Sequence, residues 1–416
     1  MKIHSLAEAN QILSRYRPTD LETAYTLDRM QALMQQLDEP QHKYKVIHVA
    51  GTAGKTSTSY FLAALLAQAG QKVGLTVSPH LDDVNDRVQL NGAPLREELF
   101  CKYLSQFLGL EPVREIKPTY FELLVAFAFW VFAQQQVDYA VIEVGLGGLL
   151  DGTNVIDRDD KVCLITDIGL DHTRILGHDL PSIAAQKAGI IQPHNHVFML
   201  QQPEEVIATV SQTAQKQGAA LQIDDPAKVA DIPISLPTYQ RRNWALAKTT
   251  FDYVAQRDVL PILTPPELNK TAIQVPGRLE VKEIHNETIV FDGAHNTAKF
   301  EALVNSLSSV VGDEPLTVVL GMVEAKEAQL KDCLKLLQPL TRRLICTGFP
   351  ANQDLFHTAI PPEQIAAAAQ ELGFRDVEVE ADAQDAFSRA LYHNRGPVLV
   401  TGSLYLLAYL RKAQRP

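Results

Sequence analysis

Short apolar runs, each about the length of one buried strand, alternate along this chain with longer segments whose pattern is typical of helices. The clearest example is KVIHVAGTAGKTSTSYFLAALLAQA at residues 45–69, which predicts a strand over 46–49, a glycine-rich turn and a helix from about Thr56. A second apolar strand follows at 72–77. A crossover of this length joins parallel strands, so we expect the two strands to pair in a right-handed βαβ unit.

The alternation continues on both sides of this unit. Residues 1–40 predict two helices separated near Pro18, which would cover the sheet, and Asn91-Gly92 predicts a turn. Residues 120–136 are apolar almost all round, as in a helix packed on a sheet. We further expect strands at 137–144 and 162–166, a helix after Pro181, and a helix that opens at Asn243-Trp244-Ala245.

The length of 416 residues suits two or three domains rather than one core. The proline-rich segment from Pro261 to Pro266 indicates the approach to an interdomain linker. From Glu287 a second α/β pattern begins. Its expected strands lie at 288–292, 316–321, 343–347, 376–380 and 397–401. The chain contains no GxGxxG motif, which argues against dinucleotide binding.

Composition limits the partners of the protein. The formal net charge of −11 argues against nucleic acid or an anionic membrane surface as a partner. The sequence shows no signal-peptide pattern at its start, and its longest apolar run, 123–133, is shorter than the ~18 residues of a membrane span. We therefore expect a cytoplasmic protein. The four cysteines are scattered without a CxxC pair, so we expect reduced core thiols rather than disulfides or zinc ligands.

The segment GTAGKT between strand and helix is typical of a phosphate-binding loop. Gly51 and Gly54 allow a tight turn, so that backbone N–H groups and a helix N-terminus point at an anion. Lys55 supplies charge for the β- and γ-phosphates, and Thr56 or Ser57 can ligate Mg²⁺. Val49 stands where the full Walker pattern has its first glycine, and the remaining pattern still predicts a nucleoside triphosphate site.

Polar residues follow the two later strands of the first domain. Glu143 ends an apolar strand, where a charge is costly unless it is paired or bound to a metal. Asp167, Asp171 and His172 follow the strand at 162–166, and in a doubly wound sheet both strand ends meet at the ligand-binding edge. We expect Mg²⁺ at Glu143, with a structural ion pair as the alternative, and His172 as a further metal ligand. The glycines of GLGG at 145–148 would allow close backbone approach to a ligand.

The ordered motifs identify a family. VAGTAGKTS, SPHL, PTYFE, EVGLGG, LDGTNVI, ITDIGLDHT, LGHDL, QKAGII, PGRLE, DGAHN and TGSLY occur in this order over nearly the whole chain. The chain thus resembles the folylpolyglutamate synthase/dihydrofolate synthase family within the Mur ligase superfamily. The resemblance implies an α/β protein with a P-loop-containing, mostly parallel sheet domain with a helical cover at 1–277. A smaller Rossmann-like domain would follow at 278–416, with the active site in the cleft between them.

The resemblance also assigns site residues. It places the ATP phosphates on Gly51, Thr52, Ala53, Gly54, Lys55, Thr56 and Ser57, with further ATP contacts at Asn243, Arg278 and Asp292. It places Mg²⁺, expected as two ions, on Ser78, Glu143 and His172. Lys187 of QKAGII matches a position that is carbamylated in relatives, and His295 and Ser403 match residues near the amino-acid and acyl-phosphate end, so we predict Lys55, Lys187, His295 and Ser403 as catalytic. The acid substrate would contact Thr119, Phe121, Leu149 and Asp151.

The chain departs from the family pattern at several positions. GTAGKT resembles the Mur branch more than the folate branch, and Thr297 stands where the family often has proline. The pattern GGRLDATN reads GGLLDGTN, so Leu149 replaces an arginine expected beside the substrate. The nucleotide and metal motifs are intact. The replacement at Leu149 instead affects which acid the protein would bind.

The implied activity is ATP-dependent C–N ligation, in which a carboxylate is phosphorylated to an acyl phosphate that the amine of L-glutamate then attacks. The acid would be dihydropteroate or folylglutamate, and we expect a monomer. One alternative is a divergent ligase of the same superfamily with another carboxylate substrate, which Leu149 favours. A catalytically silent nucleotide-binding module is a second alternative, against which the intact Lys55, Glu143, His172 and Arg278 argue.

Overall fold

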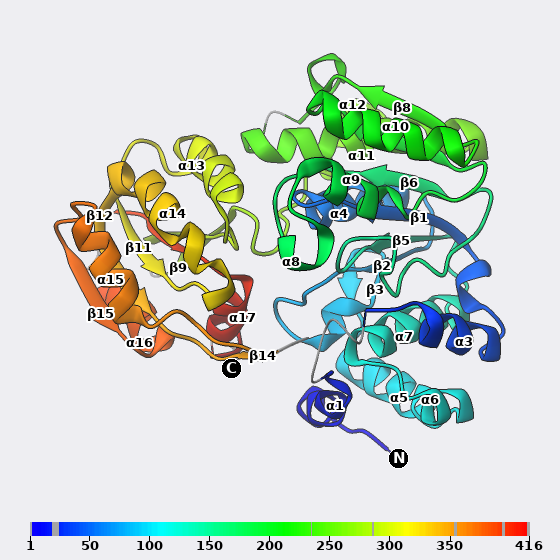
Figure 1. Cartoon of the computed structure of the whole chain (residues 1–416), viewed down its shortest axis with the longest axis horizontal. Helices are drawn as coiled ribbons and strands as arrows, with labels where there is room; N and C mark the ends of the chain where they lie inside the picture. Colours follow the sequence, from blue (N-terminus) through cyan, green and yellow to red (C-terminus); the bar gives the residue numbers. More distant parts are fainter. Residues whose placement is uncertain are drawn as a thin grey trace. The chain divides into compact units, whose positions relative to one another are not determined.

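The computed structural model describes residues 2–18, 25–233, 235–284, 287–352, 356–392 and 396–413. The chain forms two units, each built around its own sheet (Figure 1). Unit 1 comprises Met1–His80, Val84–Leu236 and Gln240–Ile273, and unit 2 comprises Leu81–Asp83, Pro237–Tyr239 and Gln274–Pro416. The predicted α/β class, with a large, mostly parallel sheet and a second sheet domain, is confirmed. The predicted boundary at residue 277 stays a prediction.

The helices of unit 1 range in length from 4 to 21 residues. In chain order its elements are α1 (Leu6–Leu13), α3 (Asp28–Gln36), β1 (Lys45–Ala50), α4 (Lys55–Gln68), β2 (Val73–Thr76), β3 (Gln89–Leu90), β4 (Ala93–Pro94), α5 (Glu97–Phe107), α6 (Glu111–Ile116), α7 (Tyr120–Gln134), β5 (Tyr139–Glu143), β6 (Val162–Ile165), α8 (Thr173–Leu176), α9 (Leu180–Ala188), β7 (His196–Leu200), α10 (Glu204–Lys216), β8 (Ala220–Asp224), α11 (Thr238–Asp258) and α12 (Pro265–Lys270).

The sheet of unit 1 has the strand order β4-β3-β2-β5-β1-β6-β7-β8. The six strands from β2 to β8 run parallel, whereas β3 and β4 continue the edge as antiparallel strands around the predicted turn at Asn91-Gly92. The predicted pairing of β1 with β2 is wrong, because β5 lies between them and pairs with both. β1 is therefore central, so the loop that follows it is flanked by the carboxyl ends of β5 and β6.

Helices cover both faces of this sheet. α7, buried on nearly all sides, packs with α1, α3 and α5 on the face that carries Val46 and Ile142. α9 and α10 pack further along the same face, against Cys163 and Val197. His48 is paired with both Ile142 and Cys163 in the ladder, so its side chain lies between these two apolar clusters. α4 packs against β1, β2 and β5 from the opposite face, as a right-handed crossover requires.

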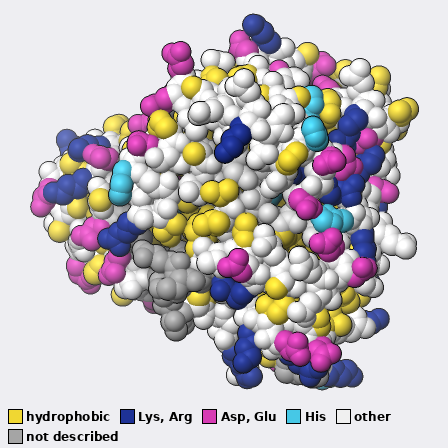
Figure 2. Space-filling view, turned by 45° about the vertical axis from the view of Figure 1, so that its right-hand side comes forward, with side chains coloured by type: hydrophobic (Ala, Val, Ile, Leu, Met, Phe, Trp, Pro, Cys, Tyr) yellow, Lys and Arg dark blue, Asp and Glu magenta, His cyan; other side chains and the backbone are white. Residues whose placement is uncertain are grey.

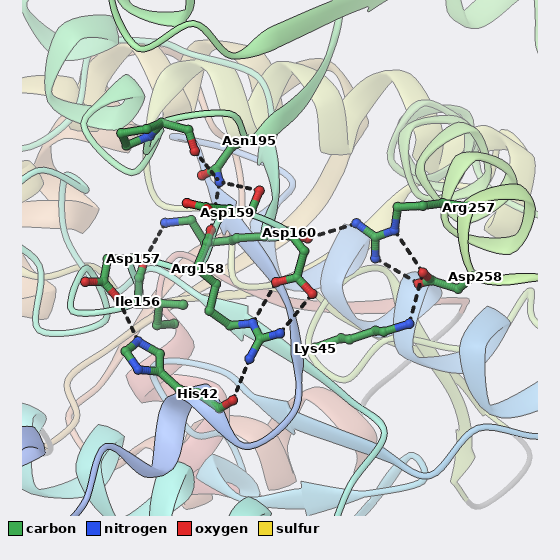
Figure 3. A network of polar contacts seen from close by, with 12 residues as sticks. His42, Lys45, Ile156, Asp157, Arg158, Asp159, Asp160, Asn195, Arg257 and Asp258 are labelled. Carbon is green, nitrogen blue, oxygen red and sulfur yellow. Dashed lines mark hydrogen bonds and ion pairs between the residues drawn. The ribbon is translucent and has the colours of Figure 1, made fainter.

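A network of polar contacts joins the last turn of α11 to the first residue of β1 (Figure 3). The same turn also contacts Tyr139, the first residue of β5. Asp258 accepts hydrogen bonds from Arg257 at 2.8 Å and Lys45 at 2.9 Å, and from the Tyr139 hydroxyl. Arg257 also donates to the carbonyl oxygen of Asp160 at 2.8 Å. Burial would raise the pKa of Asp258, but the hydrogen bonds from Arg257, Tyr139 and Lys45 outweigh it and lower the pKa to about 2. The network lies at the amino end of the strands, opposite the loop that follows β1.

Unit 2 is a smaller α/β sheet. Its elements are β9 (Glu280–Ile284), β10 (Glu287–Phe291), α13 (Thr297–Val311), β11 (Leu316–Leu320), α14 (Leu330–Leu337), β12 (Thr341–Thr347), β13 (Ala351–Asn352), β14 (Phe356–His357), α15 (Pro362–Glu371), β15 (Val377–Glu380), α16 (Ala383–Tyr392), β16 (Val398–Thr401) and α17 (Leu404–Ala413). The strand order is β15-β12-β11-β16-β10-β9, parallel except for the pair β9–β10. The five strands expected from the sequence are confirmed, and β9 is an additional antiparallel edge strand.

One helix starts earlier than predicted and another was not predicted. α11 begins at Thr238 rather than at Asn243, because the polar residues Thr238–Arg242 continue the helix without an apolar stripe. α12 was not predicted; it begins at Pro265, at the end of the proline-rich segment, and unit 1 ends shortly after it, at Ile273. Its prolines stand in the first turn, where a missing N–H costs no hydrogen bond, and Thr264 and Glu267 form a capping box.

The surface shown in Figure 2 mixes acidic and basic side chains without a patch of one sign. Within the described ranges, no helix combines the length and the apolar composition that crossing a membrane requires. The four cysteines are buried free thiols, as expected.

Candidate active site

The loop after β1 has two positions at which only glycine fits. Gly51 has φ +153°, and a Cβ there would lie 1.8 Å from the Thr166 hydroxyl oxygen. Gly54 has φ +87°, and a Cβ there would lie 2.3 Å from the Asn243 Oδ1 atom. Both glycines therefore allow side chains from other elements to touch the loop backbone, and Asn243, predicted as an ATP contact, lies directly against it.

Asp167, which follows β6, holds the middle of the loop. Its carbonyl oxygen accepts hydrogen bonds from the N–H groups of Thr52 at 2.8 Å and Ala53 at 3.0 Å. Its carboxylate accepts hydrogen bonds from Arg242 of α11, from Nε at 2.9 Å to both oxygens and from Nη2 at 2.7 Å to Oδ1. Of the predicted phosphate contacts, the N–H groups of Thr52 and Ala53 are thus bonded within the protein. The first turn of α4 starts at Lys55, and N–H groups in a first turn have no intrahelical acceptor, so this turn can bind an anion.

Two lysine side chains converge on the carbonyl oxygen of Gly51. Lys55 donates to this oxygen at 3.0 Å, and Lys187 of α9 donates to it at 2.9 Å. The Lys187 residue is only 4% exposed. The structure therefore brings these two predicted catalytic residues together at the loop, although 132 positions separate them in the sequence (187 − 55).

Glu143, at the carboxyl end of β5, lies beside the start of α4. Its Oε1 atom accepts a hydrogen bond of 2.9 Å from the Thr56 hydroxyl, and its Oε2 atom accepts one of 3.4 Å from the backbone N–H of Ser78. Glu143 is 3% exposed. A buried carboxylate beside a threonine hydroxyl provides oxygen donors, which suit Mg²⁺ with phosphate oxygens completing the shell. Glu143 and Thr56 therefore fit the predicted metal, whereas Ser78 contacts Glu143 through its backbone N–H.

His172 lies immediately before α8. It has φ +49°, and its Nε2 atom lies 4.0 Å from the Asp171 carboxylate. Its side chain is 52% exposed. Among the residues that the structure describes, no group of three or more His, Cys, Asp or Glu side chains could hold a metal ion. The role of His172 as a metal ligand stays a prediction.

The predicted acid-substrate residues gather around the glycine-rich loop 145–151. Gly145 lies between Phe121 and Asp151, because a Cβ there would be 2.4 Å from the Phe121 ring and 3.3 Å from the Asp151 Oδ2 atom. Thr119 caps α7, two residues before Phe121, with its hydroxyl accepting from the Glu122 N–H. The backbone N–H of Leu149 donates to the Gln186 carbonyl at 2.8 Å, which fixes the backbone at this position. Leu149 is nevertheless 43% exposed.

Unit 2 places Asp292 at the end of β10. The carboxylate is buried and accepts hydrogen bonds from the Leu279 N–H at 2.8 Å, the Tyr239 hydroxyl at 2.9 Å and the Ala294 N–H at 2.8 Å. Burial raises the pKa of Asp292, although the nearby Arg278 charge opposes the rise. Arg278 donates to the carbonyl of Gly277 at 3.1 Å. Asp292 therefore organises the turn that carries Arg278.

His295 and Ser403 follow adjacent parallel strands of unit 2, β10 and β16. The His295 Nδ1 atom lies 2.8 Å from the Gly293 carbonyl oxygen, and its Nε2 atom lies 2.9 Å from the Lys299 ammonium nitrogen. Ser403 is 3% exposed, and its hydroxyl oxygen accepts from the Tyr405 N–H at 3.1 Å. Both residues thus lie at the carboxyl edge of the sheet, where polar groups were expected.

Several residues at the site were missed by the sequence analysis. Thr166 and Arg242 support the phosphate-binding loop through Gly51 and Asp167, and Tyr25 donates to the Leu146 carbonyl at 2.8 Å. His48 was also missed, although the sequence marks it as unusual, because it is a polar residue in the middle of the apolar strand KVIHVA. The others depend on tertiary contacts that no local pattern shows.

Two families of protein domain and several characterised enzymes resemble this chain. Residues 49–232 match the family model of the Mur ligase middle domain, and residues 277–404 match that of the Mur ligase, glutamate ligase domain. The dihydrofolate synthetase of Saccharomyces cerevisiae is 32% identical over 92% of this chain and 96% of its own length. The chain belongs to the folylpolyglutamate synthase/dihydrofolate synthase family, within the Mur ligase superfamily.

Solved structures of the family agree over the full length. The Mycobacterium tuberculosis folylpolyglutamate synthase, solved with ADP and AMPPCP, superposes with a TM-score of 0.84 at 26% identity, covering 99% of this chain and 98% of that one. A bifunctional folylpolyglutamate synthase/dihydrofolate synthase with Mn, AMPPNP and L-glutamate bound superposes with a TM-score of 0.80 at 26% identity, covering 99% and 98% of the two chains. As a member of this family, the chain is an ATP-dependent ligase.

Proposed function

We propose that this ligase joins L-glutamate to dihydropteroate or to a folylglutamate through an acyl phosphate. The observation that carries the proposal is the near full-length similarity to dihydrofolate synthetase. The geometry around Gly51 supports it, because two lysines, a helix N-terminus and a buried carboxylate gather where a triphosphate is expected.

In the proposed reaction, the ATP phosphates lie on Gly51–Ser57 with the Lys55 charge beside them. A carboxylate oxygen of the acid attacks the γ-phosphorus while the bond to the bridging oxygen breaks, which releases ADP and forms the acyl phosphate. The neutral amine of glutamate then attacks the acyl carbon, phosphate leaves with the bonding electrons, and the amine loses a proton. Two Mg²⁺ ions on Ser78, Glu143 and His172 would neutralise phosphate charge when bound.

Residues outside the phosphate-binding loop serve the same reaction in this proposal. Asn243 of unit 1 contacts ATP, as do Arg278 and Asp292 of unit 2, and His295 and Ser403 of unit 2 act near the glutamate and the acyl phosphate. The pairing of His295 Nε2 with the Lys299 ammonium supports a role at an anionic group, because it fixes the ring beside a cation. A carbamate on Lys187, a monomeric state, a cytoplasmic location and a domain boundary at residue 277 are parts of the proposal that stay predictions.

Leu149 favours a second candidate, a ligase of the same superfamily that acts on another carboxylate. Its side chain is partly exposed at a position where the family pattern has arginine, so the site lacks a guanidinium there. An acid that is less polar at this point would lose less binding free energy than a pteroate when leucine replaces arginine.

A substrate screen separates the candidates. ADP release would be measured with ATP, Mg²⁺, L-glutamate and one acid at a time from three classes: dihydropteroate, folylglutamates and peptidoglycan precursors. The proposal expects release with dihydropteroate or a folylglutamate, and a product longer by one glutamyl unit in mass spectrometry. Release only with a peptidoglycan precursor would support the second candidate. Absence of release with every acid would favour a catalytically silent module.

A further inference from the structure

A buried chain of hydrogen bonds runs from the centre of the unit 1 sheet to the glycine-rich loop. His48 Nε2 lies 2.8 Å from the Thr153 hydroxyl oxygen, and this hydroxyl donates to Asp151 Oδ1 at 2.5 Å. The exposed fractions of His48, Thr153 and Asp151 are 0%, 0% and 2%. We call these three residues the buried relay.

The direction of the protons in the buried relay follows from its acceptors. Asp151 also accepts from the N–H groups of Thr153 at 3.0 Å and Leu146 at 2.8 Å, and from that of Gly145. A carboxyl group surrounded by donors is stabilised as the ionised acceptor, although burial raises its pKa. The hydroxyl of Thr153 has one proton, which it uses in the hydrogen bond to Asp151. The hydroxyl oxygen must therefore accept the hydrogen bond from His48, so the proton of that bond is on Nε2 of His48.

His48 is consequently neutral, with its proton on Nε2. Its Nδ1 atom is buried and has no hydrogen-bond partner among the residues that the structure describes. A charged imidazole would place a second proton on this atom without an acceptor. Burial, and secondly the charge of Lys161, lowers the pKa of His48 well below its usual value, in agreement with the neutral form.

The loop that the buried relay reaches is clamped at Leu146. The Leu146 N–H donates to Asp151, and the Leu146 carbonyl oxygen accepts from the Tyr25 hydroxyl at 2.8 Å. Gly145, one residue earlier, touches the Phe121 ring. A rotation of the Asp151 carboxylate would therefore release the backbone that separates Phe121 from Asp151.

We propose that His48 and Thr153 are positioning residues that hold Asp151 and the loop 145–151 in the arrangement that binds the acid substrate. The proposal rests on the proposed function for the identity of that substrate. Neither residue touches ATP or the reacting atoms in this account, so the buried relay should affect the acid and leave the nucleotide site unchanged.

Matched substitutions test the proposal in the full chain. Thr153→Val removes the hydroxyl at nearly constant shape, and Thr153→Ser keeps it. Thr250→Val is the control, because the Thr250 hydroxyl is equally buried and donates at 2.8 Å to the Leu246 carbonyl within α11. Thr153→Val should raise the KM for the acid about tenfold, since a buried acceptor loses its donor, with the KM for ATP unchanged. Thr153→Ser should restore most of the affinity, and Thr250→Val should leave both constants at their wild-type values.

Two readouts that need no activity complete the test. Hydrogen–deuterium exchange of the peptide containing residues 144–154 should accelerate in Thr153→Val. In ¹⁵N NMR, the histidine signal that disappears in His48→Gln should belong to a neutral, Nε2-protonated ring. Equal acid KM values for Thr153→Val and Thr153→Ser in an active enzyme would overturn the proposal, as would a His48 ring protonated on Nδ1. A wild type without acid-dependent ADP release would contradict the proposed function instead, and exchange and NMR would still decide the buried relay.

Discussion

The Lys187 ammonium donates a hydrogen bond of 2.9 Å to the Gly51 carbonyl oxygen, which joins the end of α9 to the phosphate-binding loop. A carbamate on Lys187 would keep one N–H on the same nitrogen, so this contact can persist while the carboxylate end replaces the cation. This contact is therefore compatible with the modification, which would place an anion beside the position expected for metal-bound phosphate.

Lys187→Ala tests this role. Turnover should fall about 100-fold or more, because a charged group beside the transferring phosphate is lost, and acetate or formate should restore part of it. Lys102→Ala, which changes an exposed lysine of α5, is the control and should behave as wild type. Failure of both carboxylates to restore activity, together with electron density for an unmodified Lys187 in a nucleotide-bound crystal, would contradict the carbamate.

Lys55→Ala should abolish measurable turnover with an unchanged melting temperature. The variant loses a charge contact to the phosphates, while the backbone of the loop remains held by Asp167. Steady-state ADP release and thermal melting measure the two properties separately. A variant with near-normal activity would refute the phosphate-loop assignment.

Glu143→Gln should lower kcat about 100-fold and raise the KM for ATP only a few-fold. The reason is that the metal neutralises charge that develops during phosphoryl transfer. The amide can still accept a hydrogen bond from Thr56 through its oxygen, so the fold should persist. Titration with Mg²⁺ and Mn²⁺ provides the check. If excess metal makes the variant equal to wild type, Glu143 has a structural role instead.

Asp258 should make stability depend on pH in the acid range. Its pKa is about 2 in the folded chain against an ordinary value of 3.8, so the folded state binds fewer protons than the unfolded state between these values. Its contribution is present above pH 3.8 and is lost as the pH falls through about 2. Asp258→Asn should cost about 1–3 kcal/mol of unfolding free energy near neutral pH. Urea titrations at pH 7, 5, 4 and 3 should show the difference shrinking in the acid samples, and a pH-independent difference would contradict the assignment.

The sequence predicted those parts of the fold and site that depend on local pattern. The phosphate-binding loop, its helix and the polar residues after β5 and β6 follow from periodicity and from the rule that parallel strand ends share an edge. The position of β5 between β1 and β2 depends on pairing between distant segments, which no local pattern encodes. The bonds from Thr52 and Ala53 to the Asp167 carbonyl likewise involve the backbone, which is the same for every residue type. The start of α11 was missed because its first residues are polar.

Leu149→Arg tests the acid specificity. The backbone of Leu149 is fixed and its side chain is partly exposed, so an arginine can be accommodated. If the natural acid is not a folate, the variant should create or improve folate-dependent ADP release about tenfold or more through a bidentate contact. If wild type already uses dihydropteroate with glutamate efficiently and the variant is only impaired, the divergent-substrate candidate is wrong.

The fate of the carboxylate oxygen tests the central claim most directly. The enzyme would be given ATP, L-glutamate and dihydropteroate whose carboxylate carries ¹⁸O, and the released phosphate would be analysed by mass spectrometry. Formation of an acyl phosphate transfers one carboxylate oxygen to phosphorus, so the account predicts one ¹⁸O atom in each phosphate and a glutamylated product. Phosphate free of ¹⁸O, released together with the glutamylated product, would contradict it.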